Sequence, residues 1–262
     1  MSLSPGTGAI TGYIDVAQIV LYVFWAFFAG LIYYLQKESK REGFPLETDL
    51  PSGETRISSG LVGMPTPKTF YPAHGDPVTV PNNKRSAQQL HAKPSHRWIG
   101  APLEPTGNPM LDGVGPGAYA DRADVPDYTF EGDAKIVPLR VAHGYGVASH
   151  DPDPRGMQVI GADGVVGGTV TDLWIDKSEM IFRYLELTVA SGNAWRQVLL
   201  PMNFARVSGG SVKVQSILGH QFAQVPGLRG GEQVTLLEEE KVMAYYGGGT
   251  LYASPDRQEP LV

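Results

Sequence analysis

The sequence opens with a long apolar run. Residues 16–35 read VAQIVLYVFWAFFAGLIYYL, without an ionisable side chain and with one strongly polar residue, Gln18. A helix of this length extends about 30 Å, which matches the hydrocarbon core of a lipid bilayer. The pattern therefore predicts a single transmembrane helix, which we place at residues 12–36 after a short extracytoplasmic segment, 1–11.

Basic residues flank this run on one side only. Asp15 is the single charged residue before Lys37, and lysine and arginine follow the run directly. The positive-inside rule then predicts an N-terminus outside and residues 37–262 in the cytoplasm. The absence of a basic stretch before the run argues against a cleaved signal peptide. The side chains expected to anchor the helix at the membrane interface are Tyr33, Tyr34, Lys37, Lys40 and Arg41.

The predicted helix also carries a set of small residues. Ala26, Ala29 and Gly30 would let another helix approach closely, whereas simple anchoring in lipid explains the same run equally well. Because the run contains no charge, the helix alone offers no path for protons or ions.

A proline-rich segment follows the helix. Residues 45–116 contain 12 Pro and 8 Gly, together with scattered apolar and aromatic residues such as Phe70 and Trp98. Proline interrupts regular ladders, but disordered segments are usually poor in apolar side chains. We therefore predict an extended, ordered strap over 37–116 that lies on partner subunits, with a short edge strand within 72–81. A loose linker is the alternative.

The pattern changes again at Lys135. Short alternating or apolar runs, separated by turn residues, are typical of β-strands. Asp163-Gly164 and Gly209-Gly210 are turn dipeptides of β-hairpins. Several strands so close together predict a small β barrel or half-barrel within residues 117–250. The runs lie at 135–142, 157–176, 180–189 and 196–218.

One helix is predicted after these strands. Thr235 and Glu238 have the spacing of a capping box, and EEEKVMAYY continues the helical pattern. Three glycines at 247–249 are expected to end it, which gives a helix at 235–246 and a C-terminal tail at 251–262. The predicted fold class is a single N-terminal transmembrane helix plus a mainly β cytoplasmic domain with one C-terminal α-helix.

Composition excludes several functions. A net charge of −6 and a pI near 5.5, without a basic block, argue against nucleic-acid binding. The absence of cysteine excludes disulfides, thiolate metal sites and cysteine nucleophiles. The glycine-rich pieces lack the strand–loop–helix context of a phosphate loop, and the histidines lack metal-ligand spacing. We therefore predict no catalytic residue, metal ligand or cofactor-binding residue in this chain.

The carboxylates carry the remaining chemistry. Glu131 and Asp133 flank a glycine, and Asp172, Asp176 and Glu179 cluster in TDLWIDKSEMIFRY. Each is most simply a solvated acid in a loop. A carboxylate buried against a partner would instead have a raised pKa and could relay protons.

Several blocks carry a family resemblance. FWAFFAGLIYYLQKESKREGFPLE, PKTFYPAHGDPVTVP, GTVTDLWIDKSEMIFRYLELTV and VTLLEEEKVMAYYGGGTLYA resemble the H subunit of the purple-bacterial photosynthetic reaction centre. The blocks follow in order from the apolar run almost to the C-terminus. The piece TVTDLWID…RYLELTV also resembles the PRC-barrel core, which is shared more widely.

The resemblance implies a non-catalytic role in electron transfer. Such a subunit lies in the bacterial inner (intracytoplasmic) membrane and caps the L and M subunits, with a cytochrome subunit and light-harvesting antenna as further possible partners besides membrane lipids. Bacteriochlorophyll, bacteriopheophytin, quinones and a non-haem iron are expected in the partner subunits. The H subunit would stabilise the core, shield the quinone region and conduct protons to the secondary quinone.

The resemblance also implies particular site residues. Glu179 matches the family's buried proton-pathway glutamate, and Asp176 and Arg183 match its acidic and basic neighbours, with Asp172 as a weaker member. A His-Gly-His string that takes up protons in some members is Glu131-Gly132-Asp133 here. Carboxylates could still collect protons there, but metal binding by paired histidines should be weakened. Asp127 stands where the family often has another acid.

Two other functions compete with this interpretation. A membrane-tethered PRC-barrel adaptor unrelated to photosynthesis would share the anchor and the β domain. An enzyme domain on a membrane anchor would need a nucleophile, metal or cofactor motif, which the residues do not supply.

Overall fold

The computed structural model describes residues 15–50, 55–82, 89–98 and 100–258. The chain divides into two compact units, residues 1–85 and 86–262, and each is described by itself. The boundary falls inside the segment predicted as one strap. The predicted N-terminal segment 1–11 lies outside the described residues.

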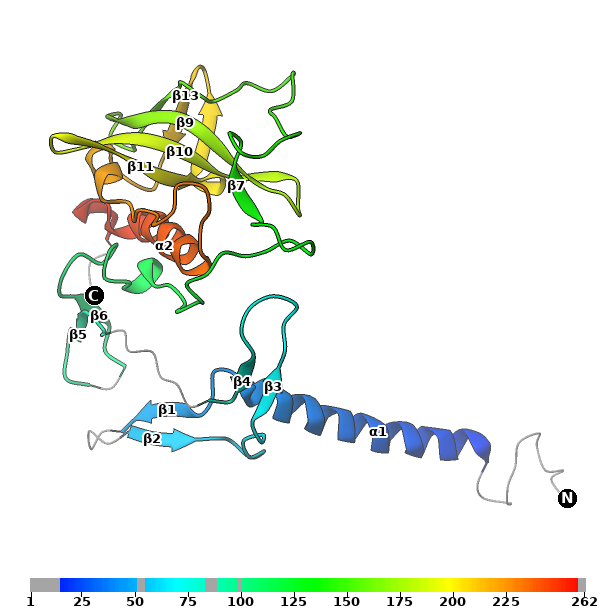
Figure 1. The fold of residues 1–262 in the computed structure, drawn as a ribbon. Coiled ribbons are helices and arrows are strands. Elements are labelled where there is room, and N and C mark those ends of the chain that lie inside the picture. Colours follow the sequence, from blue (N-terminus) through cyan, green and yellow to red (C-terminus); the bar gives the residue numbers. More distant parts are fainter. Residues whose placement is uncertain (1–14, 51–54, 83–88, 99, 259–262) are drawn as a thin grey trace, which may run out of the picture. The chain divides into compact units, whose positions relative to one another are not determined.

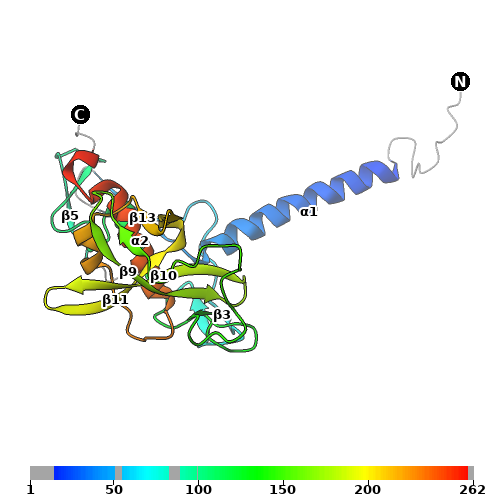
Figure 2. The same ribbon diagram turned by 90° about the horizontal axis from the view of Figure 1, so that it is seen from above.

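The N-terminal unit contains one long helix, α1, Val16–Glu38 (Figure 2). The Asp15 carboxylate caps it by accepting the backbone N–H of Gln18 at 2.8 Å. No side chain of α1 is buried within the chain, and the apolar stretch Val16–Arg41 is long and apolar enough to cross a membrane. The helix continues two residues beyond the predicted end at 36, because Lys37 and Glu38 keep helical geometry into the short η1, Ser39–Arg41.

Two hairpins follow α1 in this unit (Figure 1). β1, Leu46–Asp49, pairs with β2, Thr55–Ser58, and β3, Lys68–Phe70, pairs with β4, Val78–Val80. β4 confirms the short strand predicted within 72–81. Parts of the proline-rich segment of this unit thus form local antiparallel pairs.

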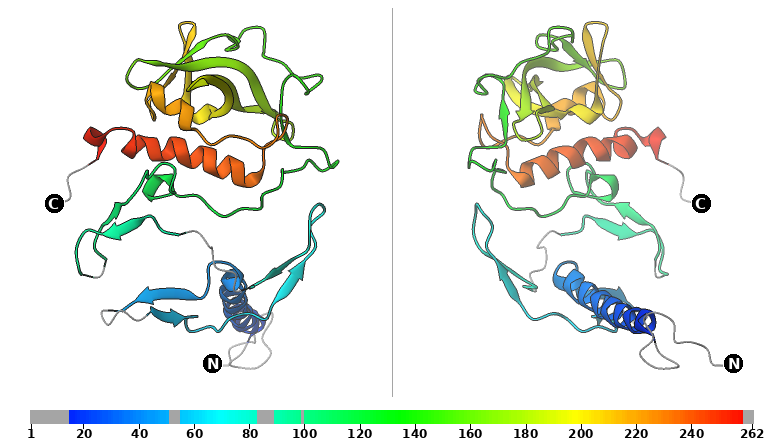
Figure 3. Two further views of the ribbon diagram at one scale, coloured as in Figure 1. Left: turned by 60° about the vertical axis from the view of Figure 1, so that its left-hand side comes forward. Right: turned by 90° about the vertical axis from the view of Figure 1, so that its right-hand side faces the viewer.

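The C-terminal unit contains the main sheet. Its strand order is β11-β10-β9-β8-β13-β12, with β7 also paired to β9, and the only parallel neighbours among these described strands are β8 and β13. The sheet curls into the half-barrel shown in Figure 3, which confirms the predicted β domain. The strands are β7 Ile136–Pro138, β8 Gln158–Ile160, β9 Val166–Asp176, β10 Ile181–Ser191, β11 Ala194–Pro201, β12 Ala205–Ser208 and β13 Ser211–Val214.

Shorter elements complete this unit. A third hairpin joins β5, Ala92–Pro94, to β6, Leu103–Pro105. Short 3₁₀ helices lie between the larger elements and after the last helix. They are η2 Gly115–Gly117, η3 Met202–Phe204, η4 Gly219–Gln224 and η5 Pro255–Arg257.

Both predicted hairpin dipeptides occupy turns. Gly209 and Gly210 have φ of 61° and 77° between β12 and β13, a region that favours glycine. Gly164, with φ of 77°, turns the chain between β8 and β9. The preceding Asp163 accepts backbone N–H groups from Val165 at 3.2 Å and from Gly219 at 3.0 Å, which ties the turn to η4.

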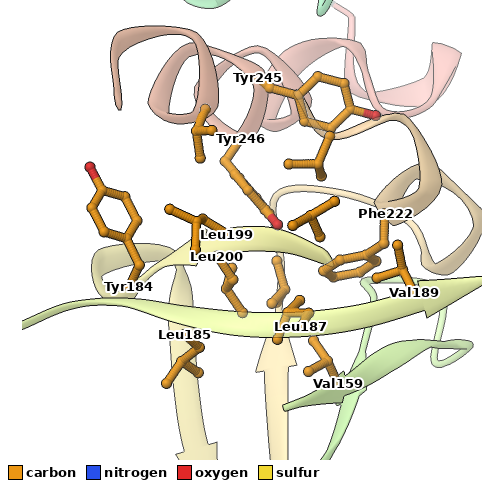
Figure 4. Close-up of a cluster of buried hydrophobic side chains, with 14 of the residues drawn as sticks. Val159, Tyr184, Leu185, Leu187, Val189, Leu199, Leu200, Phe222, Tyr245 and Tyr246 are labelled. Carbon is orange, nitrogen blue, oxygen red and sulfur yellow. The ribbon is translucent and has the colours of Figure 1, made fainter. Parts of the chain in front are cut away.

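The core of the unit lies between the sheet and helix α2, Leu236–Tyr252. In Figure 4 the side chain of Tyr246 extends from α2 toward Leu199 and Phe222, whereas the Tyr245 hydroxyl donates to the Gln221 carbonyl of η4 at 2.8 Å. These side chains are almost completely buried. Burying each contributes roughly 1.5–3 kcal/mol relative to exposure, so this layer supplies most of the driving force for packing α2 on the sheet.

The capping box at the start of α2 is confirmed. The Thr235 hydroxyl accepts the backbone N–H of Glu238 at 3.1 Å, and the Glu238 carboxylate accepts that of Thr235 at 2.9 Å. Both residues are buried, so the box also satisfies polar groups that water does not reach.

The predicted end of this helix is wrong. α2 passes through Gly247–Gly249 and ends at Tyr252, six residues beyond the predicted end at 246. The glycines serve close packing: a methyl group on Gly249 would lie 2.5 Å from the Ser216 carbonyl oxygen, and one on Gly248 would lie 3.1 Å from Gly117 Cα. Packing against neighbouring backbone therefore outweighs the helix-breaking tendency of glycine.

Candidate functional site

A groove of about 740 Å³ in the C-terminal unit gathers an unusual density of charge. It lies between β10, the segment before β7 and the first turns of α2. Its apolar walls include Ile136 and Phe182. The ionisable residues that line it are Arg122, Asp127, Lys135, Asp176, Arg183, Tyr184, Glu239 and Glu240.

An alternating chain of charges crosses one side of this groove. The Lys135 ammonium lies 3.3 Å from the Asp127 carboxylate and 3.7 Å from that of Asp176. Arg183 lies 3.4 Å from Asp176 through Nε and 2.8 Å from Glu179 through Nη2. The order acid–base–acid–base–acid runs from Asp127 to Glu179, and we call these five residues the charge chain.

The charge chain sets the pKa of its lysine. Burial lowers the pKa of Lys135, but attraction to Asp176 and the hydrogen bond to Asp127 outweigh that effect. The net pKa lies above the ordinary value of lysine. Lys135 therefore stays charged and holds two carboxylates close together that would otherwise repel each other.

Asp176 is the centre of the charge chain. It is completely buried, and its Oδ1 accepts the backbone N–H groups of Ser178 and Glu179, each at 3.0 Å. These bonds shape the turn from β9 to β10, in which Met180 has a φ of 55°. One carboxylate oxygen is thus used to build the turn, while the other faces Lys135 and Arg183.

Glu179 lies at the exposed end of the charge chain. Its side chain is 49% exposed in the isolated chain, so its burial would need a partner. The next residues in the chain, Met180 and Ile181, are exposed apolar side chains. An acid beside exposed apolar groups suits a surface that another protein covers.

The three predicted uptake residues differ in their side-chain partners. Asp127 joins the charge chain through Lys135. Asp133 pairs with Lys177 at 3.3 Å but remains 75% exposed, and Glu131 is exposed in the turn that contains Gly132. Water can therefore reach these acids, and Asp127 is the one of the three that belongs to the charge chain.

Asp172 belongs to a different cluster. It lies opposite Glu186 on β10, and Arg140 Nη1 bridges the two carboxylates at 3.1 Å and 2.9 Å. Trp174 donates to Glu186 at 2.9 Å. Four residues of extended strand, roughly 13 Å, separate Asp172 from Asp176, so this predicted member does not extend the charge chain.

Sequence analysis did not single out Glu239 and Tyr184 as site residues. Tyr184 donates a hydrogen bond of 2.7 Å to Glu239 inside the groove. Burial raises the pKa of Glu239 above its ordinary value, against the opposing effect of this hydrogen bond. Glu239 is one of three consecutive glutamates at the start of a helix. Acidic residues are favourable there because of the helix dipole, so the sequence gives no sign of a further role.

The predicted membrane anchors also differ in their surroundings. Tyr33 and Tyr34 are exposed on α1 and Lys37 is half-buried. Lys40 is buried, donates to the carbonyl oxygens of Ser59 and Val62, and lies 5.5 Å from the Phe44 ring centroid.

Arg41 has a similar arrangement within the N-terminal unit. It forms a bidentate salt bridge with Glu38, with both hydrogen bonds at 2.8 Å. It also donates to the carbonyl oxygens of Thr66 at 2.8 Å and Val80 at 3.1 Å. Lys40 and Arg41 thus fasten the following segment to the end of α1.

Within the part of the chain that the structure describes, no group of three or more His, Asp or Glu side chains is arranged to hold a metal ion. The groove instead presents paired acids and bases.

Comparison with known protein families identifies the class and then the family. Residues 147–221, which contain most of the curled sheet and the first part of η4, match the PRC-barrel domain. Residues 8–141, just over half of the chain, match the N-terminal region of the photosynthetic reaction centre H-chain. The chain therefore belongs to the reaction centre H-chain family, which confirms the resemblance found in the sequence.

The two family matches cover different parts of the structure. PRC-barrel domains alone would fit an unrelated membrane-tethered adaptor. The H-chain match covers α1 and both hairpins of the N-terminal unit as well as β5 to β7. That match favours a structural component of a reaction centre over the adaptor.

Proposed function

We propose that this chain is the subunit that caps the L and M core of a photosynthetic reaction centre and conducts protons to its secondary quinone. In this proposal α1 crosses the bacterial inner membrane with its N-terminus in the periplasm. The β domain then lies in the cytoplasm, where it shields the quinone region. The observation that carries the proton-conducting role is the charge chain from Asp127 to Glu179.

The membrane topology rests on α1 and its flanking charge. An apolar helix whose side chains are not buried in the chain itself needs another apolar surrounding, which lipid or partner helices supply. The basic residues at its C-terminal end favour the cytoplasmic side for the rest of the chain.

The proton-conducting role rests on how the acids are spaced. A quinone that receives two electrons also takes up two protons, and a site shielded from water needs titratable groups that lead inward. Asp127 meets solvent, Asp176 is buried, and Glu179 is exposed beside apolar residues that a partner would cover. A partner that covers Glu179 would place this carboxylate between the rest of the charge chain and the quinone region.

The redox cofactors are assigned to the partner subunits. In the proposed complex, L and M would hold bacteriochlorophyll, bacteriopheophytin, quinones and the non-haem iron. A first test is to purify the chain from its own membranes in mild detergent and record an absorption spectrum. Co-purifying near-infrared bacteriochlorophyll bands would support the assignment, and a colourless preparation with other partners would favour the adaptor.

The proton role is tested by Glu179→Gln in the intact complex. Glutamine keeps the size of the side chain but cannot carry a proton, so we expect flash-induced second electron transfer to the secondary quinone to slow by roughly tenfold or more. The first electron transfer, which needs no proton, should keep its rate. Transient absorption after two flashes measures both steps.

A matched control separates the proton path from general charge effects. Glu232→Gln removes the same charge from an exposed position outside the charge chain and should leave both steps unchanged. Equal slowing in the two variants, or an unchanged rate in Glu179→Gln with full quinone occupancy, would contradict the role of Glu179. The subunit assignment would then still stand on the absorption test.

A further inference from the structure

A second depression, of about 620 Å³, lies at the base of the β12–β13 hairpin, near the C-terminal end of α2. It is separate from the charged groove, sharing with it only Asn203 among the lining residues. The residues that line it are Asn203, Phe204, Ala205, Arg206, Lys213, Gln215, Ser216, Thr250 and Arg257. Three are cations and none is a carboxylate, in a chain whose net charge is −6.

Two of these cations face each other across the hairpin. Arg206 and Lys213 are directly opposed partners in the β12–β13 ladder. Like charges in this position repel each other and destabilise a hairpin. Both side chains are exposed and neither forms an ion pair within the described ranges, so solvent alone screens their repulsion.

The third cation is held in place by backbone. Arg257 donates through Nη1 to the carbonyls of Ser216 at 2.8 Å and Gly249 at 2.7 Å, and through Nη2 to that of Gln215 at 3.0 Å. These acceptors are neutral, so they orient the guanidinium without cancelling its charge. The acid next to it in sequence, Asp256, is exposed and hydrogen-bonds Ser254.

A buried hydroxyl adds an independent observation. Ser216 is only 5% exposed, and its Oγ has no hydrogen-bond partner in the described structure. A buried polar atom without a partner costs stability, so native proteins rarely leave one. Asn203, Gln215 and Thr250 add further neutral hydrogen-bonding groups to the same walls.

We propose that this depression binds a phosphate-class anion, either free phosphate or the phosphate of an anionic lipid headgroup. The anion would relieve the repulsion between Arg206 and Lys213 and meet a guanidinium that is already oriented. Arginine and lysine together with neutral donors are the groups that recognise phosphate oxygens in proteins. This site is distinct from the proposed proton path and does not depend on it.

Isothermal titration calorimetry of the full chain in neutral detergent, with inorganic phosphate as the probe, tests the site. We expect saturable binding with a dissociation constant on the order of millimolar, and at least about tenfold weaker binding in the double variant Arg206→Gln/Lys213→Gln. The matched control, Lys93→Gln/Arg97→Gln, removes the same charge from two exposed positions of the same unit and should bind phosphate like the wild type. Sodium chloride of equal ionic strength corrects for screening.

A second titration distinguishes the two sources of the anion. The chain is placed in nanodiscs of phosphatidylcholine with or without phosphatidylglycerol. Competition by phosphatidylglycerol that disappears in the Arg206→Gln/Lys213→Gln variant would identify a lipid headgroup, and phosphate binding without competition would identify a free anion. Either result supports the site.

Three outcomes would overturn the proposal. Phosphate binding could be absent, it could weaken equally in the control, or it could persist in the Arg206→Gln/Lys213→Gln variant. Binding of a glutamate-rich peptide in place of phosphate would also overturn it and would make the depression a protein contact. Urea denaturation verifies folding: removing the opposed charges should leave the variant at least as stable as the wild type in phosphate-free buffer.

Discussion

The two units of the chain are held together by different forces. In the C-terminal unit, buried apolar side chains from Ala101 to Ala253 form a packed interior. In the described part of the N-terminal unit, the buried residues are Lys40 and Pro65. The C-terminal unit therefore has a hydrophobic core of its own. The N-terminal unit relies on backbone pairing between strands and on cations that bind carbonyl groups.

This difference indicates where each unit finds its stability. Burial of apolar surface is the main driving force of folding, and the N-terminal unit buries little apolar surface within itself. Its apolar side chains along α1 remain exposed within the chain. We infer that lipid and partner subunits complete this unit, in agreement with its match to the H-chain N-terminal region.

The largest expected effect is in the core of the C-terminal unit. Leu187→Ala removes a completely buried side chain and should destabilise that unit by about 2–5 kcal/mol. Urea denaturation of the full chain in detergent, followed by tryptophan fluorescence, measures it, because Trp174 is buried in this unit and changes its surroundings on unfolding. Leu61→Ala, at a fully exposed position of the other unit, should change stability by less than about 0.5 kcal/mol. Similar losses in both variants would contradict the contrast between the units.

The next effect concerns the second charged cluster of the C-terminal unit. Arg140→Met leaves the carboxylates of Asp172 and Glu186 opposed across two strands without their shared cation. We expect a loss of about 1–3 kcal/mol, reduced from the value for a fully buried pair because Arg140 is 38% exposed. Arg155→Met, which breaks an exposed pair with Asp153, should cost under about 1 kcal/mol in the same urea assay. A larger loss in Arg155→Met would refute this ranking.

A smaller effect is expected from the pH dependence of Glu239. Burial raises the pKa of Glu239 in the folded chain. Its contribution to the free energy of unfolding is therefore fully present below the unfolded pKa of roughly 4.3, and it is lost as pH rises through the folded pKa. Glu239→Gln should remove this decrease and raise relative stability near neutral pH by under about 1 kcal/mol. Urea denaturation between acid and neutral pH, with Glu240→Gln as the control, measures the difference. Parallel pH profiles for wild type and Glu239→Gln would count against a raised pKa.

The smallest global effect is expected in the N-terminal unit. Lys40→Met removes the ammonium that binds the carbonyls of Ser59 and Val62, so the segment around them should be cleaved faster in limited proteolysis. The urea transition of the C-terminal unit should not move. Lys37→Met, which removes a charge one helical turn earlier, should leave the cleavage pattern unchanged. A shifted urea transition in Lys40→Met would show that the units are energetically coupled.

Much of the fold followed from local pattern. The apolar run, the alternating strands, the hairpin glycines and the Thr235 capping box each depend on residues close together in sequence, and the structure confirms them. The exception was the triple glycine of α2. Its effect depends on distant neighbours, Ser216 and Gly117, that no local pattern contains.

The candidate site was predictable only in part. The resemblance to the H subunit pointed to Asp176, Glu179 and Arg183, which lie close together in the sequence. The sequence could not exclude Asp172 from the charge chain. Its exclusion depends on two contacts from other segments, Arg140 with Asp172 and Lys135 with Asp176. Glu239 escaped notice because its partner, Tyr184, is 55 residues away in sequence.

The sequence by itself determined the apolar helix, the strands and the family to which the chain belongs, because hydropathy and short motifs act over a few residues. Only the tertiary structure decided which charges meet: Asp127 with Lys135, Lys40 with backbone carbonyls, and Arg206 and Lys213 with each other. A local pattern specifies the faces of one element, whereas strand order and packing select which faces come together. The chemistry of this chain depends on that selection.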